Sequence, residues 1–429
     1  MVMVDIIPQM YLFEECYFEN LMYLLFLLKM LLKGIIPVIP ILTGIKTQFI
    51  IMPKNVFILS VRKSNQLKIK EGKERSNKLK QFFGTSRRGD LKEALRGLNN
   101  PQLIMLFSTD EQFDAHVKEL EKLYPGIPSI GCIGMSYAAN MTEKGVSVIA
   151  FYDGVTVSAG ILESVSTMPV KYISRLEQDL KKVNPSPKDT ICIDLCSGND
   201  ACVLTTIYSV LKRQNISLVG GTGDAGRVSA NGQVYQDATA YAFVKNNNGR
   251  VKAYKENIYH RMGNYYFIAS KTNRAEYIIG ELNGKPARDV YQEILHVTEK
   301  EIQTQTFKNP FGKISGNDTC IISIKEVQGN ALKCFRQVND SDVLILLELD
   351  DYEAVVKNTI QTIRQDFSRI SAVFSVNCLF RYLLFTENQY LPKYLQEMSS
   401  LGNHAGFIGY GEHYNNRFVN QSMTCVVFE

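Results

Sequence analysis

The stretch ISLVGGTGDAGRVSANGQVY, residues 216–235, indicates which kind of fold this chain adopts. Its glycines at positions 221, 223 and 226 spell the Gly-x-Gly-x-x-Gly pattern of dinucleotide-binding loops, which requires a helix directly after the glycines to face the pyrophosphate. No helical pattern follows. Asn231-Gly232, a dipeptide typical of a tight turn, separates two runs with alternating apolar residues. The sequence therefore predicts a hairpin, and it indicates glycines that let the backbone turn or approach a ligand or another strand.

The composition is that of a globular protein with reduced thiols. Of 429 residues, 45% are hydrophobic and 21% are charged, which suits two or more domains and excludes a disordered scaffold. The nine cysteines form no Cys-x-x-Cys pair and the five histidines do not cluster near them, so neither a zinc site nor a disulfide framework is indicated. We therefore expect free thiols and a cytoplasmic protein.

Basic residues concentrate in residues 53–90, a segment that leads into the fold. Between Lys54 and Arg88, eleven Lys and Arg stand against two Glu, a local charge of 11 − 2 = +9, whereas the whole chain carries +5. Such a run is typical of a solvated linker or helix face, and it also suits an anionic membrane or nucleic acid. Because the run holds only three aromatic residues for base stacking, we expect no nucleic-acid partner.

An apolar N-terminal extension, residues 1–52, precedes the basic segment, and its most apolar part is residues 21–52. Lys29 and Lys33 interrupt this part, each at a cost of about 2.5–3.5 kcal/mol for membrane insertion. Three interpretations stay open: a poor membrane anchor, an interfacial helix, and an extension outside the native folded protein. We favour the last, because Met52 stands just before the globular pattern begins, and we expect membrane contact only if the segment is native.

Strand-like and helix-like patterns alternate from about residue 90 onward. Residues 145–152 and 155–162, parted by Asp153-Gly154, predict another hairpin. Near residue 278 the alternation begins anew, which predicts two domains, 91–277 and 278–429. We expect a mixed α/β (α+β) fold whose partly antiparallel sheets are flanked by helices, with helix–sheet–sheet–helix as the candidate layering.

Polar residues follow the strand pattern at residues 190–195. Cys196 and Ser197 stand directly before a helical pattern at residues 201–214, where a polar side chain can cap the helix. A helix N-terminus can hold an anion and lowers the pKa of a neighbouring thiol. No base accompanies Cys196, since the nearest histidine in sequence, His260, is 64 positions away, so a structural or ligand-lining role is favoured over catalysis.

The order of motifs over residues 85–429 resembles that of the FIST proteins, sensory modules with an N-terminal and a C-terminal FIST domain. IGCIGMS (130–136) and VGGTGDAG (219–226) resemble the two glycine turns of the first domain, and ELNGKPARDVYQEIL (281–295) resembles the opening of the second. FSVNCLFRYLLF (374–385) and GYGEHYNNRFVNQSMT (409–424) resemble its Ser-Cys-x-x-Arg and Gly-Glu segments. The resemblance implies small-ligand sensing in signal transduction, with amino acids as proposed ligands.

The chain departs from the family pattern at three places that bear on ligand recognition. Val419 stands where many relatives have histidine, Leu379-Phe380 replace a pair of small residues, and His413 stands where an aliphatic residue is usual. The ligand of this chain therefore does not follow from the resemblance.

Arg381 and Glu412 are the leading candidates for ligand binding. The planar fork of Arg381 suits a carboxylate and Glu412 suits an ammonium, so together they complement a zwitterion. The alternative is that these two side chains pair with each other. Cys378 is expected to be a packed thiol. The full candidate set is Arg381, Glu412, Asn377, Cys378, Gly411, Asn420, Gly221, Gly223, Asp224, Cys196 and Ser197.

Three functional classes remain open. We favour a ligand-binding sensor without catalytic residues, metal or cofactor, which passes its signal to a downstream signalling protein. The second class is a thiol-dependent enzyme using Cys196 or Cys378. The third is a haem-based nitric-oxide sensor, as described for some FIST-like proteins, in which His260 is the candidate axial ligand.

Overall fold

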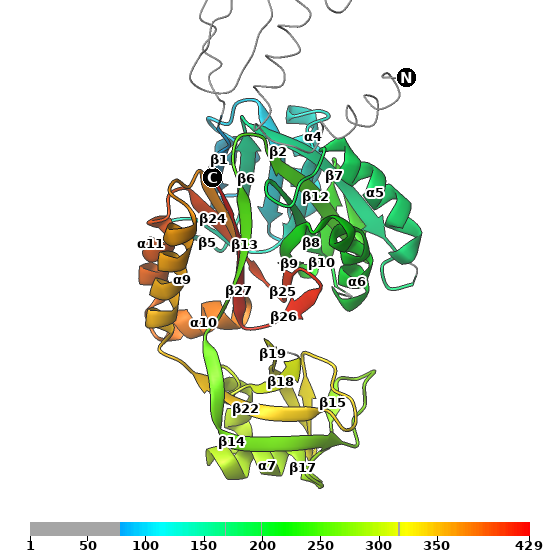
Figure 1. Cartoon of the computed structure of the whole chain (residues 1–429), viewed down its shortest axis with the longest axis vertical. Helices are drawn as coiled ribbons and strands as arrows, with labels where there is room; N and C mark the ends of the chain where they lie inside the picture. Colours follow the sequence, from blue (N-terminus) through cyan, green and yellow to red (C-terminus); the bar gives the residue numbers. More distant parts are fainter. Residues whose placement is uncertain (1–77, 168, 199, 316–317) are drawn as a thin grey trace, which may run out of the picture. The chain divides into compact units, whose positions relative to one another are not determined.

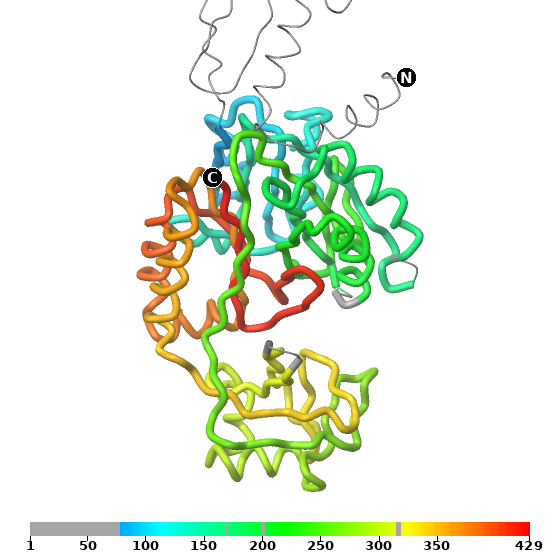
Figure 2. Tube along the Cα trace, in the orientation of Figure 1, coloured from blue at the N-terminus to red at the C-terminus, as the bar shows by residue number. Residues whose placement is uncertain are grey.

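The computed structural model describes residues 78–429, apart from Met168, Asn199 and residues 316–317 (Figures 1 and 2). The apolar extension at 1–52 and most of the basic segment at 53–90 lie outside the described residues. Of the helices in the described part, none is both long and apolar enough to cross a membrane.

Three segments of the chain fold into the same four-stranded unit. In each unit two parallel strands are connected by helix, and a strand that comes later in the chain pairs in antiparallel fashion with the earlier of these two. The first strand of the unit lies on the other side of that later strand. The first unit comprises β1 (Lys80–Ser86), β2 (Pro101–Ser108), α4 (Phe113–Leu123), β3 (Ser129–Ile133) and β6 (Val146–Tyr152). The second comprises β7 (Val155–Glu163), β8 (Thr190–Cys196), α6 (Asp200–Leu211), β9 (Ser217–Thr222) and β12 (Ala238–Asn246). The third comprises β13 (Val251–Asn257), β23 (Ala372–Cys378), α10 (Leu379–Glu387), α11 (Leu391–Ser399), β24 (His404–Gly409) and β27 (Ser422–Phe428). Their sheet orders are equivalent: β1-β6-β2-β3, β7-β12-β8-β9 and β13-β27-β23-β24.

Each unit donates a hairpin to the free edge of another unit. The first unit's β4 (Ser136–Tyr137) and β5 (Met141–Thr142) extend the third sheet at β24. The second unit's β10 (Asp224–Ala230) and β11 (Gln233–Gln236) extend the first sheet at β3, and the third unit's β25 (Glu412–Tyr414) and β26 (Arg417–Val419) extend the second at β9. The exchange is cyclic, so each six-stranded sheet is completed by another unit.

A Gly-x-x-Gly pattern recurs at the strands that accept a donated hairpin. GCIG (131–134) begins in β3, GGTG (220–223) begins in β9, and GFIG (406–409) lies within β24. A Cβ on Gly220 would lie 2.2 Å from the Asp194 carbonyl oxygen of the neighbouring strand. The donated strand places His413 opposite Gly220, and the His413 Nδ1 contacts the Asp194 carboxylate at 2.7 Å. The first glycine of the pattern therefore makes room for a side chain of the donated strand.

One hydrophobic core lies between the inner faces of the three sheets. Phe107 stacks on Phe407 and Phe151 packs on Phe428, which joins the first sheet to the third. Helices cover the outer faces: α4 on the first sheet, α5 (Ile173–Lys182) and α6 on the second, and α9 (Tyr352–Asp366), α10 and α11 on the third. The predicted α+β class with partly antiparallel sheets flanked by helices is confirmed, and three sheets surround the core.

The third unit carries an insert, residues 259–349, between β13 and α9. Its six-stranded sheet has the order β17-β16-β14-β22-β18-β19, with β14 (Tyr259–Ser270) and β22 (Val343–Leu349) at its centre. A three-stranded sheet, β15-β21-β20, and α7 (Ala287–Leu295) complete it (Figure 1). Its own core is separate from that between the three sheets. Position 278, where the sequence pattern restarts, lies within this insert.

The first predicted hairpin is confirmed. β10 and β11 pair in antiparallel fashion across Asn231 and Gly232, whose φ angles of 48° and 79° suit a tight hairpin turn. Strands, and no helix, follow the glycines from Asp224 to Asn246, so the structure bears out the exclusion of a dinucleotide-binding loop.

The predicted hairpin at Asp153-Gly154 is wrong. Both residues turn with positive φ, but β6 pairs with β1 and β2 whereas β7 pairs with β12, in another sheet. Phe151 and Val155 on either side of the turn both enter the shared core. The two strands therefore face each other across the core in different sheets. Burial of their apolar side chains there stabilises this arrangement, and each backbone forms its hydrogen bonds with other strands.

Candidate functional site

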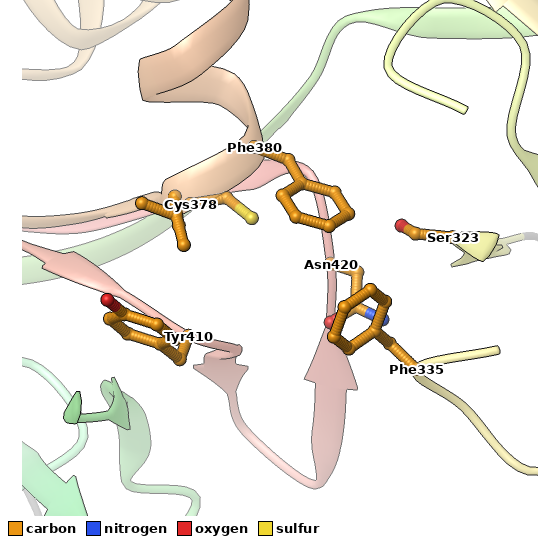
Figure 3. A pocket seen from close by; sticks show the side chains of 7 residues that line it. Ser323, Phe335, Cys378, Phe380, Tyr410 and Asn420 are labelled. Carbon is orange, nitrogen blue, oxygen red and sulfur yellow. The ribbon is translucent and has the colours of Figure 1, made fainter. Parts of the chain in front are cut away.

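A pocket of about 170 Å³ opens between the third unit and the insert (Figure 3). Residues from five places in the chain line it: Cys378, Leu379 and Phe380 at the junction of β23 and α10, Tyr410 after β24, Asn420 before β27, Ser323 before β20 (Ile324–Gln328), and Phe335 after β21 (Ala331–Cys334).

The pocket forms because two parallel strands end at one edge. Cys378 is the last residue of β23 and lies in register with Gly409, the last residue of β24. In the second unit the residue equivalent to Cys378 is Ser197, whose hydroxyl accepts a hydrogen bond of 2.8 Å from the Ala238 amide. In the second unit, this hydrogen bond closes the strand edge with residues of the same unit. In the third unit, the insert covers the equivalent edge, and the pocket lies between the two.

Aromatic rings form most of the wall. The rings of Phe335 and Phe380 meet edge to face with centroids 5.1 Å apart, and Phe380 also contacts Phe307. Phe335 and Tyr410 are each 41% exposed, so both stand at the opening. In the view of Figure 3, Phe380 and Tyr410 lie nearest the Cys378 side chain, and the Phe335 ring lies beside Asn420.

Asn420 is a lining residue with a polar group that has no partner. Its side chain is 6% exposed and its Nδ2 atom has no hydrogen-bond acceptor. The other polar lining groups are engaged: the Ser323 hydroxyl accepts from Gln421 Nε2 at 2.7 Å, and the Tyr410 hydroxyl donates to Asp224 at 2.9 Å. The Nδ2 atom is closed off from solvent, so the open space of the pocket does not reach it.

Cys378 lines the pocket, and Glu412, which does not, lies in contact with it. Burial raises the pKa of the Cys378 thiol well above its ordinary value, and the charge of Glu412 adds to the rise. Burial likewise raises the pKa of Glu412 well above its ordinary value. The raised pKa keeps the Cys378 thiol protonated, which is the opposite of the lowered thiol pKa that a nucleophile needs.

Arg381 does not meet Glu412. It lies one turn into α10, is fully buried, and forms an ion pair with Glu256 of β13. Its guanidinium also lies 4.9 Å from the Phe385 ring centre and 5.5 Å from that of Tyr394. The sequence predicted either a ligand carboxylate or Glu412 as the partner of Arg381, and the structure has Glu256 in that place. Arg381 does not line the pocket.

Two candidate glycines hold strands close together near the pocket. Gly221 of β9 lies opposite Glu412, and a Cβ there would come 2.6 Å from the Gly411 carbonyl oxygen. A Cβ on Gly223 would come 2.7 Å from Cys132 Cβ. These glycines permit close approach of another strand, which is one of the two roles expected for them.

The remaining candidates lie away from the pocket. Asn377 is buried beside the lining residue Cys378 but does not line the pocket itself. Cys196 is fully buried, with its sulfur 3.1 Å from the Thr239 hydroxyl. His260 is half-exposed, and its two ring nitrogens contact Glu348 and Asp350. Among the described residues, no group of three or more His, Cys, Asp and Glu is arranged to hold a metal ion.

Five lining residues escaped the sequence analysis as ligand candidates: Ser323, Phe335, Leu379, Phe380 and Tyr410. Phe380 carried a signal, since Leu379-Phe380 stand where the family pattern has small residues. Tyr410 lies between Gly409 and Gly411, and Glu412 follows directly. The two glycines mark a strand end. Ser323 and Phe335 come from the insert, and no local pattern connects them with β23.

Two family models match most of the described chain. The FIST N domain matches residues 102–285, and the FIST C domain matches residues 287–415. The chain belongs to the FIST family, whose domains are generally sensory domains of signal transduction. A search of curated proteins finds no significant match.

Proposed function

We propose that this protein is a sensor that binds a small molecule in the pocket between the third unit and the insert. The observation that carries the proposal is the pocket itself: it is mostly apolar, its volume is about 170 Å³, and residues of both the third unit and the insert line it. A concave apolar site with few convergent polar groups is the usual form of a small-ligand site.

The signal would leave through the insert. Ser323 and Phe335 belong to the insert, whereas Cys378, Phe380 and Asn420 belong to the third unit, so one ligand would contact both. Without ligand, the two parts are already joined by Gln421, whose Nε2 donates to the Thr306 carbonyl at 3.1 Å and to the Ser323 hydroxyl. A bound ligand adds contacts across the same junction and so changes how firmly the insert is held, which a downstream protein can read.

The amino acids and carboxylates implied by the family resemblance are the first ligands to test. The zwitterion model assigns the carboxylate to Arg381, which is engaged with Glu256 and does not line the pocket. A thiol-dependent reaction at Cys378 is not supported, because the raised pKa keeps the Cys378 thiol in its protonated form. Haem ligation by His260 would require the loss of its contacts with two carboxylates.

A thermal-shift screen of the full chain tests the proposal. The panel contains free amino acids, small carboxylates and small ring amides. A ligand at 100 times its dissociation constant stabilises the folded state by about 2.7 kcal/mol. We expect the shift to shrink in Phe335→Ala and to persist in Tyr265→Ala, an exposed aromatic residue of the same insert outside the pocket. Equal shifts in both variants would place binding elsewhere and refute the site.

A further inference from the structure

The insert carries most of the exposed apolar side chains in the described part of the chain. Of the eleven large hydrophobic side chains that are exposed there, seven belong to the insert, which makes up about a quarter of that length. Four of them, Tyr266, Ile268, Ile314 and Val343, are 47–56% exposed. Because soluble proteins rarely gather exposed apolar side chains, such a surface typically marks an interaction site.

Three of these side chains form a row across neighbouring strands (Figure 1). Ile268 of β14 pairs with Val343 of β22. On the other side of β22, Lys313 of β18 (Phe311–Ser315) pairs with Leu344, so the next residue of β18, Ile314, comes beside Val343. Since residues opposite each other on paired strands share a face, the row Ile268–Val343–Ile314 lies on one face of the sheet.

The same face is already an interface nearer the third unit. Alternate residues of a strand point to the same side, so Ile345 and Leu347 lie on the same side of β22 as Val343. Both are buried in the hydrophobic cluster that contains apolar residues of α9, α10 and α11. The opposite face of β22, with Leu344, packs in the core of the insert. The row is therefore the uncovered continuation of an apolar face that packs on the third unit.

The charge of the insert suits contact with a second copy of the insert. Residues 259–349 hold eleven Lys and Arg against eleven Asp and Glu, 11 − 11 = 0. Two copies therefore meet without net repulsion between their inserts, and a net charge near zero favours association. A highly charged partner would find no net opposite charge on this part of the chain.

We propose that two copies of this chain associate through the open face of the insert sheet centred on Val343. Sheets pack face to face about 10 Å apart. A two-fold axis that lies between two such faces and passes over Val343 places this residue opposite its own copy. If the axis also runs parallel to the strands, Ile268 lies opposite Ile314 of the second copy, so the row is complementary to itself.

The insert also lines the ligand pocket, so association at this face is a route by which the signal leaves the sensor. Association through the sheet face does not require an occupied pocket. The dimer and the ligand site therefore stand or fall separately.

Sedimentation velocity of the full chain over a series of protein concentrations tests the proposal. We expect the 48.5 kDa chain to form a dimer. Val343→Glu should raise the dissociation constant at least about tenfold, because it places an unpaired charge in the interface. Val170→Glu is the matched control, since it adds the same charge at a valine of the second unit that is 63% exposed, and it should leave the dimer unchanged. All variants carry the same N-terminal extension, so any association through that segment is common to them.

Opposite charges at the centre of the face separate a second copy from any other partner. Val343→Glu and Val343→Lys should each remain monomeric alone and form a mixed dimer when combined, because the two-fold axis brings the two side chains together. If Val343→Glu does not fold, Ile268→Glu on the neighbouring strand tests the same face, since Ile268 is 56% exposed.

Three results would overturn the proposal. The first is a native chain that stays monomeric at every concentration. The second is a dimer that survives Val343→Glu or that Val170→Glu disrupts to the same extent. The third is a mixture of the Val343→Glu and Val343→Lys variants that does not associate, which would exclude a two-fold arrangement centred on Val343.

Discussion

The guanidinium of Arg381 forms an ion pair with the carboxylate of Glu256, 125 positions earlier in the chain, and neither side chain reaches solvent. The pair connects α10, which begins at the pocket, with β13, which precedes the insert. It therefore removes the cation that a ligand carboxylate would need, and it ties α10 to the strand that leads into the insert.

Arg381→Met should destabilise the fold because it leaves Glu256 as a buried, uncompensated charge. Removing one partner of a buried pair typically costs about 3–5 kcal/mol of unfolding free energy. Urea unfolding measures the change. The double variant Arg381→Met with Glu256→Leu should recover much of the loss, and a single-variant loss below about 1 kcal/mol would show that the pair is not sealed in solution.

Gly220→Ala should destabilise the exchange of strands between the units. A Cβ there would lie 2.0 Å from one carboxylate oxygen of Asp194. The same carboxylate contacts His413 of the donated strand, so the added Cβ would displace that contact. We expect a loss of at least about 1–3 kcal/mol, as for other overpacked sites.

Gly134→Ala is the matched control, because its nearest neighbour, the Ile408 carbonyl oxygen, is 3.8 Å from the added Cβ. We expect a change within about 0.5 kcal/mol. Equal thermal denaturation midpoints for the Gly220 and Gly134 variants would contradict the steric account.

His404 should make stability fall in acid. Burial lowers the pKa of His404 to about 3, whereas an unfolded histidine titrates near 6.5. Between these values the unfolded chain binds the extra proton, so the free energy of unfolding should decrease as pH falls, by up to about 1.4 kcal/mol per pH unit from this group.

His404→Gln stays neutral throughout this window and should lose less stability than the native chain between pH 6.5 and 4. Urea midpoints of the two proteins across the window measure the difference. Parallel pH profiles would show that His404 titrates normally in the fold.

Gln421→Ala should loosen the insert. It removes two buried hydrogen bonds to Thr306 and Ser323 and leaves the Thr306 carbonyl without this donor. Hydrogen exchange should become faster in residues 259–349 and stay unchanged in the first unit. Gln303→Ala, which breaks a bond within the insert to the Lys325 carbonyl, is the control for a purely local effect. Faster exchange throughout the chain would mean that Gln421 supports the fold as a whole.

Local patterns predicted local structure well. Asn231-Gly232 specified a hairpin because a tight turn needs positive φ at both central residues, and this requirement is visible in two letters of sequence. Asp153-Gly154 also produced a tight turn, yet β6 and β7 entered different sheets. The turn sets the direction of the chain, but the sheet that a strand joins depends on which distant strands offer a free edge.

The candidate site could be predicted only in part for the same reason. Cys378 and Asn420 belonged to the candidate set and line the pocket, but the partner of Arg381 comes from β13 and the lining residues Ser323 and Phe335 come from the insert. The recurrence of Gly-x-x-Gly at 131, 220 and 406 was a signal of internal repetition that the sequence analysis did not use.

The most direct test of a ligand site shared by the insert and the third unit uses a single tryptophan. The chain contains none, so Phe335→Trp places one reporter at the pocket opening, and Tyr265→Trp places a control elsewhere on the insert. Titration of both full-length variants with the compound that gives the largest shift in the thermal-shift panel should give a saturable fluorescence change for Phe335→Trp and none for Tyr265→Trp. The same response from both reporters, or a response from the Tyr265 reporter alone, would contradict a ligand site at this junction.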